Sequence, residues 1–397
     1  MDEVHAALTA VFREEAGRLT AALVRILDDF AVAEDIVQDT LLVALEHWPR
    51  EGIPERPGAW LLTVARRRAL NQLSRDARYR AKLAQLEQPV PREPDDRVRL
   101  MFTCCHPALS RPAQIALTLR AVCGFTTAEI AHAFLAKEAT LAQRIVRAQR
   151  KIVAAHIPYR MPSDHEMNER LREVLAVLYL MFTEGYLTSA GAVATRRDLA
   201  EDAAWLTALV AEQLASEPEP LGLLALMRLQ LARSRARTTE AGELILLQDQ
   251  DRTLWDRAMI REGIALIERA AALGRPGPYQ VEAAIVACHA EAASWTTTDW
   301  RQILLLYDLL LLMMPTPVVQ LNRAVALWQV AGPEAALAEI TPLARDLDHY
   351  HLFHAIRGRL LRELSEREQA RAATLRALEL TQNRAEQSLL TRRLVEW

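Results

Sequence analysis

Cysteine is scarce in this chain, and no long apolar run crosses it. The four cysteines, which form no CxxC pair, are Cys104, Cys105, Cys123 and Cys288. Neither a disulfide framework nor a cysteine-based metal site is therefore expected. The longest apolar run, residues 303–314, contains Asp308 and is too short to span a bilayer, and the N-terminus lacks the pattern of a secretory signal. We expect a cytoplasmic protein that has no metal, no cofactor and no membrane contact.

Glycine and aromatic residues are also sparse, and this limits the fold class. Thirteen glycines occur in 397 residues, aromatic residues make up 6%, and hydrophobic residues, with Ala and Leu prominent, make up 51%. This composition favours helices over sheets. We therefore predict an all-α protein. The chain is longer than one ordinary hydrophobic core allows, so two or three domains are expected.

The net charge of −3 hides a strong asymmetry along the chain. Residues 1–160 carry 23 Lys/Arg and 19 Asp/Glu, a net charge of +4, whereas residues 161–397 carry 25 and 32, a net charge of −7. Within the first part, residues 1–55 have a net charge of −8 and residues 56–82 a net charge of +7. The first part therefore has the charge of a nucleic-acid binder, with an acidic surface beside it that can bind a partner.

Residues 125–152, FTTAEIAHAFLAKEATLAQRIVRAQRKI, have the pattern of two short helices around a turn. In the second helix four apolar residues at i, i+4, i+7 and i+11 form one stripe: Leu141, Ile145, Ala148 and Ile152. The opposite face collects side chains that reach phosphates and base edges in a major groove: Thr140, Gln143, Arg144, Arg147, Arg150 and Lys151. This pattern predicts either a DNA-binding helix-turn-helix or an amphipathic hairpin with a solvated basic face.

Three further helices are expected near the N-terminus, over residues 11–30, 33–48 and 59–75. Prolines and a glycine between the last two, beginning at Pro49, should break the chain there. The second helix has a broad apolar stripe that ends at Leu45. The third carries several arginines and Trp60, a combination found in proteins that bind single-stranded nucleic acid. An exposed arginine-rich helix with a tryptophan in the core is the alternative.

Three ordered segments together resemble a known family. They are AEDIVQDTLLVALEHW, RPGAWLLTVARRRALNQLSR and, after a spacer, LSRPAQIALTLRAVCGFTTAEIAHAFLAKEATLAQRIVRAQRKI. In this order and spacing they are similar to a bacterial extracytoplasmic-function (ECF) sigma factor, a compact specificity subunit of RNA polymerase with two helical domains. The resemblance covers residues 8–155.

The resemblance implies roles for individual residues and implies core RNA polymerase and promoter DNA as partners. The helix over residues 33–48 would bind the polymerase clamp through Asp35, Gln38 and Asp39. The helix over residues 60–75 would contact the melted −10 element through Trp60, Arg66, Arg67, Arg68, Asn71 and Arg75. The second helix of the helix-turn-helix would bind the double-stranded −35 element, with Arg150 and Lys151 on flanking phosphates.

The turn of the helix-turn-helix departs from the usual family pattern, and a linker is expected before this second domain. Between the two helices of the helix-turn-helix, the family usually has a turn with two glycines and a lysine, whereas this chain has LAKEATLAQR at residues 135–144. A promoter sequence therefore cannot be transferred from other members. The stretch 83–96 is rich in proline and charge and is expected to be an extended linker between domains at 1–82 and 97–160.

The remaining residues, 161–397, are predicted to be helical throughout. The clearest segments are 167–185, 197–215, 221–237, 255–273, 280–294 and 300–314. Near the end, small residues recur at a spacing of 34, as Ala324 and Ala336 do relative to Gly358 and Ala370. This period predicts a tetratricopeptide-like domain, whose helices stack closely and can bind a protein or peptide. The same part resembles the C-terminal extension of one ECF group.

Two clusters permit a catalytic or metal-binding alternative. Residues 248–257, QDQDRTLWDR, and 274–280, GRPGPYQ, offer three aspartates together with cationic and phenolic side chains: Asp249, Asp251, Asp256, Arg252, Arg257 and Tyr279. The aspartates are more readily explained as helix caps, because no phosphate loop or nucleophile motif accompanies them. Cys104, Cys105 and His106 are adjacent in sequence and cannot all face one ion from a helix end.

The sequence therefore predicts a sigma factor, with no catalytic residues, that recognises −10 and −35 elements and is regulated or supported by its C-terminal domain. Two alternatives use the same residues. One is a helix-turn-helix regulator that acts without polymerase. This alternative gives no role to the acidic helix and does not explain why the chain has two DNA-contacting modules. The other is an enzyme whose chemistry lies in residues 165–397.

Overall fold

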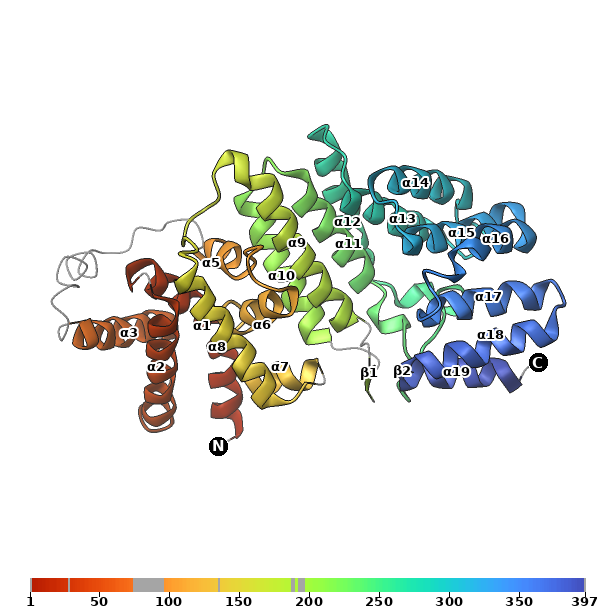
Figure 1. Cartoon of the computed structure of the whole chain (residues 1–397). Helices are drawn as coiled ribbons and strands as arrows, with labels where there is room; N and C mark the ends of the chain where they lie inside the picture. The colour runs from red at the N-terminus through yellow and green to blue at the C-terminus, as the bar shows by residue number, and fades with distance from the viewer. Residues whose placement is uncertain are drawn as a thin grey trace. The chain divides into compact units, whose positions relative to one another are not determined.

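A computed structural model describes residues 2–27, 29–73, 96–134, 136–186, 190–191 and 197–395. The predicted all-α class is confirmed: helices dominate both compact units of the chain, Met1–Val177 and Leu178–Trp397 (Figure 1). Among the described residues the strands are β1 (Ala190–Gly191) and β2 (Gln382–Asn383), which pair in parallel. No helix in the described part of the chain is long and apolar enough to cross a membrane.

The described part of the first unit consists of helices of 7 to 26 residues. They are α1 (Asp2–Leu27), α2 (Phe30–Glu51), α3 (Pro57–Leu73), α5 (Asp96–Cys104), α6 (Arg111–Ala121), α7 (Thr127–Ala133) and α8 (Glu138–Ala154), followed by the start of α9 (Asp164–Tyr186). The predicted linker over residues 83–96 lies outside the described residues, apart from Asp96 at the start of α5.

The predicted break between these two helices is present, but it begins at Gly52 rather than at Pro49, because α2 continues through Pro49 to Glu51. Proline removes the N–H that would bond to the carbonyl of Leu45, but Leu45 is 38% exposed and water can take that place. The exposure of Leu45 also corrects its assignment to the buried stripe. The helix ends at Gly52, whose φ of +86° suits glycine and whose N–H donates to the carbonyl of Trp48 at 2.9 Å. Pro57 then opens α3 at its first turn.

Helix α1 joins the two halves of the first unit, since it packs against α2 and α3 on one side and against α5 and α6 on the other. A Cβ atom on Gly17 would lie 2.2 Å from the carbonyl oxygen of Val122, so only glycine fits at this approach. The hydroxyl of Tyr159 donates to the carbonyls of Ala21, 3.0 Å away, and Asp96, 3.1 Å away. Residues far apart in the sequence therefore hold α1 to the second half of this unit.

The second unit is a succession of helices, several of them in adjacent antiparallel pairs. After the end of α9 they are α10 (Arg197–Gln213), α11 (Pro218–Leu231), α12 (Arg257–Ala272), α13 (Pro278–Glu291), α14 (Trp300–Met313), α15 (Pro317–Ala331), α16 (Pro333–Ile340), α17 (His351–Glu363), α18 (Arg367–Leu380) and α19 (Arg384–Val395). Short 3₁₀ turns lie between them, including η3 (Leu247–Asp249) and η4 (Arg252–Leu254).

The predicted helix over residues 221–237 is too long at its C-terminal end. Helix α11 ends at Leu231, and the chain turns through a 3₁₀ segment, Ser234–Ala236. The carbonyl of Ala232 accepts from the backbone N–H of Asp256 at 2.9 Å, and Arg237 donates to the carbonyl of Tyr186 at 2.6 Å. Contacts with distant segments thus end a helix that local sequence would have continued.

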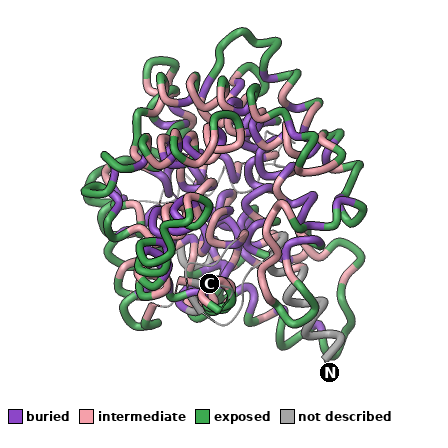
Figure 2. Tube along the Cα trace, turned by 90° about the vertical axis from the view of Figure 1, so that its right-hand side faces the viewer, coloured by how far each residue is buried: buried purple, intermediate pink, exposed green. Residues whose placement is uncertain are grey.

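Small residues lie where paired helices of the second unit approach closely. Gly358 of α17 faces α18, and a Cβ atom there would be 2.6 Å from the hydroxyl of Thr374 and 3.2 Å from the carbonyl of Ala370. Ala324, Ala336 and Ala370 are fully buried. Figure 2 shows buried residues alternating with intermediate and exposed ones along the helices, as amphipathic packing requires. The tetratricopeptide-like character of these helices stays a prediction.

Candidate nucleic-acid interface

Helix α8 separates apolar and cationic side chains onto opposite faces. The predicted stripe is confirmed, because Leu141, Ile145, Ala148 and Ile152 are at most 6% exposed and the helix packs against α6 and α7. On the other face Thr140, Gln143, Arg147, Arg150 and Lys151 are exposed and Arg144 is partly exposed. Among the described residues no carboxylate pairs with these four cations, so their charge is available to an anionic partner.

The exposed face of α8 forms one wall of a groove with a volume of about 370 Å³. The other wall comes from the start of α6 and the turn before it. The groove is lined by Leu109, Ser110, Ala113, Thr140, Gln143, Arg144, Arg147, Ala148 and Lys151. The predicted −35 residues therefore lie together, apart from Arg150, which is exposed on the same helix outside this lining.

The helix before α8 is held by local hydrogen bonds. Thr126 caps α7: its hydroxyl accepts from the N–H of Glu129 at 3.1 Å, and the Glu129 carboxylate accepts from the N–H of Thr126 at 2.8 Å. Gly124, with φ of +73°, forms the sharp turn after α6. Ile130 and Ala131 are buried and Phe134 is half-buried, and α7 packs against α8.

The predicted polymerase-binding residues share the exposed face of α2. Asp35, Gln38 and Asp39 are all exposed, while Ile36, Val37 and Thr40 between them are buried. The helix begins at Asp29, whose carboxylate accepts from the N–H groups of Ala31 and Val32. The surface that the sequence predicts is therefore accessible.

Helix α3 presents its basic side chains beside this acidic face. Arg67 is exposed, Arg66 and Arg68 are half-buried, and Arg68 donates to the carboxylate of Asp39 at 2.8 Å. Because both side chains of this ion pair reach solvent, it contributes at most about 1 kcal/mol and can exchange for other partners. The predicted −10 and polymerase-binding residues thus touch across α2 and α3.

Trp60, the predicted base-stacking residue, packs partly into the protein. Its ring meets the ring of Trp48 edge to face, with centroids 5.4 Å apart, and lies 6.4 Å from the ring of His47. Part of the side chain remains accessible. Asn71 lies within α3, and Arg75 lies outside the described residues.

Sequence reasoning missed the role of Glu34, which lies on α2 directly before Asp35. Its carboxylate accepts from Arg120 Nε of α6 at 2.6 Å and from the side-chain amide of Gln149 of α8. The side chains of Glu34 and Arg120 are 13% and 18% exposed. Glu34 therefore links the acidic helix to the helix-turn-helix, a long-range contact that no local pattern indicates.

Of the adjacent Cys104, Cys105 and His106, the two cysteines are buried and the histidine is partly exposed. Burial raises the pKa of both thiols, that of Cys105 to about 12, which opposes formation of the thiolate that a metal needs. His106 Nδ1 accepts from the N–H of Ala108 at 3.1 Å. In the described part of the chain no group of three metal-ligating side chains comes together.

The aspartates of residues 248–257 serve mainly as caps. Asp251 accepts from the N–H of Thr253, and Asp256 accepts from the N–H groups of Ala258 and Met259 at the start of α12. These contacts support the structural explanation over the catalytic one. Arg252 is 8% exposed and donates to the carbonyl of Ala292 at 2.7 Å. Arg252 therefore has a structural role.

Comparison with known proteins explains this arrangement. Residues 11–79 match the family "Sigma-70 region 2", residues 99–152 match "Sigma-70, region 4", and residues 170–271 match a family of unknown function, DUF6596. ECF RNA polymerase sigma factor SigL of Mycobacterium tuberculosis is 32% identical over 155 residues, which cover 37% of this chain and 87% of SigL. The chain belongs to the ECF sigma factors.

This sigma factor carries a long C-terminal extension. An uncharacterized protein of Rhizobium meliloti (strain 1021) is 42% identical over 387 residues, covering 94% of this chain and 92% of the relative. The extension is thus shared with a relative of nearly the same length. No solved structure matches the chain. Membership of this family makes the protein a transcription initiation factor rather than an enzyme.

Proposed function

We propose that this sigma factor binds core RNA polymerase through the exposed acidic face of α2. Asp35, Gln38 and Asp39 lie on that face, within the region 2 match. Reversing a surface carboxylate weakens a charged interface without removing any core packing. The partner in this proposal is the polymerase of the same cell, so the protein acts in the cytoplasm.

Promoter recognition would use the two basic helices. In region 2, the −10 contacts would come from α3 and the residues after it: Trp60, Arg66, Arg67, Arg68, Asn71 and Arg75. The arginines suit the backbone of a melted strand, and the accessible part of Trp60 suits an unstacked base. In region 4, α8 would enter the major groove of the −35 element through Thr140, Gln143, Arg144 and Arg147, with Arg150 and Lys151 on phosphates.

The observation that carries this proposal is the cationic face of α8. It presents four basic side chains that no described carboxylate neutralises, on a helix whose other face is fully buried. In a hairpin with a merely solvated face, some pairing with nearby acids would be expected. The region 4 match gives such a face a DNA partner.

The polymerase contact can be tested by charge reversal. Asp35→Arg and Asp39→Arg should each weaken binding to core polymerase, measured with purified components, while the circular dichroism spectrum and melting temperature stay unchanged. Glu51→Arg is the control, because Glu51 is an exposed carboxylate of the same helix that lies about 120° or more around the helix axis from Asp35 and Asp39. Unchanged core affinity in both aspartate variants would contradict the assignment of this face.

The C-terminal extension would regulate or support the first two regions rather than perform chemistry. Its close helix pairs, such as α17 with α18 at Gly358, support a tetratricopeptide-like stack that binds a protein or peptide. Its net negative charge also allows it to shield a cationic helix.

Truncation tests this role, and the structure indicates where to cut. Arg170 of α9 donates to the carbonyl of Phe102, and Glu173 pairs with Arg111 at 3.0 Å, so a cut after Val177 keeps these contacts whereas a cut after Ala155 removes them. A rise in promoter-directed transcription after truncation indicates inhibition by the extension, and a fall with the fragment still folded indicates support. Unchanged transcription would show that the extension acts independently.

A further inference from the structure

The C-terminal unit contains a pocket rich in arginine, with a volume of about 630 Å³. We call it the arginine pocket. It is lined by Thr239, Leu244, Ile245, Leu246, Gln248, Asp249, Ala355, Arg359, Arg362, Glu363, Thr374, Leu389, Arg392 and Arg393. Its size falls within the range of about 300–1,000 Å³ that is usual for small-molecule sites. A single inorganic ion would fill only part of it.

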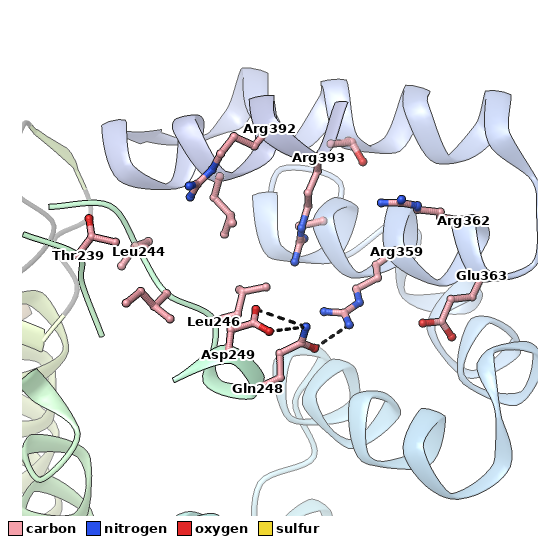
Figure 3. A pocket seen from close by; sticks show the side chains of 14 residues that line it. Thr239, Leu244, Leu246, Gln248, Asp249, Arg359, Arg362, Glu363, Arg392 and Arg393 are labelled. Atoms are coloured by element: carbon pink, nitrogen blue, oxygen red, sulfur yellow. Dashed lines mark hydrogen bonds between the residues drawn. The ribbon is translucent and has the colours of Figure 1, made fainter. Parts of the chain in front are cut away.

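Four separate stretches of chain build the walls, one of them being α18, which contributes Thr374. Helix α17 supplies two arginines and a glutamate, α19 supplies two more arginines, and residues 239–249 form the facing wall. That wall is held in shape by a bridge between Thr238 and Leu244 and by the side-chain amide of Gln250, which donates to the carbonyl of Ile245 at 3.1 Å. In Figure 3, Arg359 and Arg393 extend from their helices toward Gln248 and Asp249.

The pocket has a positive charge within an acidic part of the chain. Four arginines and two carboxylates line it, a net charge of +2, whereas residues 161–397 as a whole have a net charge of −7. Both carboxylates already accept hydrogen bonds. Glu363 accepts from Trp328 Nε1 at 2.8 Å, and Asp249 accepts from the side-chain amide of Gln248 at 3.3 Å. Arg392 also pairs with Glu243, which lies outside the lining, at 3.0 Å, so acids balance part of this positive charge.

Arg359 is held in position by two contacts with neighbouring side chains. It donates to Gln248 Oε1 at 2.8 Å, and its guanidinium carbon lies 4.8 Å from the centre of the Trp328 ring. Burial lowers the pKa of Arg359, and the neighbouring Arg362 acts in the same direction against the opposing effect of Glu363 and Asp249. A bound anion would offset both the burial of the Arg359 charge and its repulsion by Arg362. A fixed guanidinium with a second one beside it is suited to bidentate binding of phosphate or carboxylate groups.

We propose that the arginine pocket binds a small organic molecule that carries two or more phosphate or carboxylate groups. The volume sets the size of the ligand, and the four guanidiniums set its charge. This site would give the C-terminal extension a ligand of its own, and the inference does not depend on the proposed contacts with polymerase or promoter.

The test is calorimetric titration of the full-length protein with inorganic phosphate, pyrophosphate, citrate and fructose 1,6-bisphosphate at constant ionic strength. We expect at least one of the organic polyanions to bind more tightly than phosphate. Arg359→Gln and Arg362→Gln should each weaken this binding by about tenfold or more, since each removes charge-assisted hydrogen bonds. Arg362 is exposed, so its variant should fold even if the partly buried Arg359 proves necessary for stability.

Two control variants separate this site from other cationic surfaces. Arg376→Gln removes a partly exposed arginine of α18 that pairs with Glu379 at 3.1 Å outside the pocket, and Arg147→Gln removes an exposed arginine of α8. Neither should change the affinity for the polyanion. The proposal is overturned if no polyanion binds with a Kd below about 1 mM, if the control variants weaken binding as much as the pocket variants do, or if only an acidic peptide binds.

Discussion

The carboxyl group of Glu282 gives the second unit a stability that depends on pH. It lies on α13 and accepts from the Tyr179 hydroxyl at 3.3 Å. Burial raises its pKa from 4.5 to about 7, with a smaller contribution from the nearby Glu219, while the hydrogen bond from Tyr179 acts in the opposite direction. The phenol of Tyr307 also faces this group, and its own pKa is raised by burial and by the Glu282 charge. The folded protein therefore holds a proton here that the unfolded chain would release.

The sign of the effect follows from the raised pKa. Below pH 4.5 Glu282 is protonated in both states and costs nothing. Between pH 4.5 and about 7 the folded state binds more protons than the unfolded state, so stability falls as the pH rises. Above pH 7 the full cost is present, and at about 1.36 kcal/mol for each pH unit between the two pKa values it amounts to at most about 3 kcal/mol.

Glu282→Gln removes the ionisable group and keeps a carbonyl oxygen that can accept from Tyr179. We expect the variant to be more stable than the parent at pH 8 by about 1–3 kcal/mol and nearly equal to it at pH 5. The measurement is urea unfolding of the full-length protein at both pH values. Glu268→Gln, on the exposed side of α12, is the control and should show no such difference. If the Glu282→Gln variant gains the same stability at pH 5 as at pH 8, the reasoning is refuted.

Three further predictions concern DNA reading and packing. Arg144→Ala should relax the −35 sequence preference and cost about 1–3 kcal/mol of binding free energy. Lys151→Ala should weaken binding to all sequences and lower the slope of log K against log salt concentration by about one charge. Equal losses for all sequences from both variants in binding titrations would mean that the reading face is wrongly assigned. Glu34→Ala leaves the mostly buried guanidinium of Arg120 without its carboxylate partner and should cost about 1–3 kcal/mol of stability, seen as faster amide exchange in α6 and α8. Unchanged exchange there would show that Glu34 does not link α2 to these helices. Gly358→Ala should cost about 1–3 kcal/mol in urea unfolding, and Thr374→Ala in the same chain should restore part of it; a neutral Gly358→Ala would show that α17 and α18 can separate freely.

Local sequence patterns predicted the helical class and the buried and exposed faces of α8, because these features have local causes, whereas several helix ends differ from the predicted ones, as in α1, which spans Asp2–Leu27 rather than residues 11–30. The period of Leu141, Ile145, Ala148 and Ile152 specifies one buried stripe, and the basic residues occupy the remaining surface whatever the partner helices are. Thr126 and Glu129, three residues apart, likewise form a cap that local sequence alone can specify. The charge change between residues 1–55 and 56–82 anticipated the acidic face of α2 beside the basic α3.

Features that depend on distant residues were missed or misplaced. Glu34 appeared to be a surface acid because its partners, Arg120 and Gln149, are 86 and 115 residues away. The helix over residues 221–237 was extended too far because its end depends on contacts with Tyr186 and Asp256. The arginine pocket combines four stretches of chain, and none of them is unusual by itself.

The most direct test of the account is transcription reconstituted from full-length protein, core polymerase purified from the same organism and fragments of its DNA. The account predicts that the protein binds core polymerase and produces transcripts with discrete start sites, each preceded by two sequence elements at a constant spacing. Asp39→Arg should abolish these transcripts by loss of core binding, and Arg144→Ala should redistribute them among promoters. Failure of the parent protein to bind core polymerase, with transcripts no different from those of core polymerase alone, would contradict the central claim.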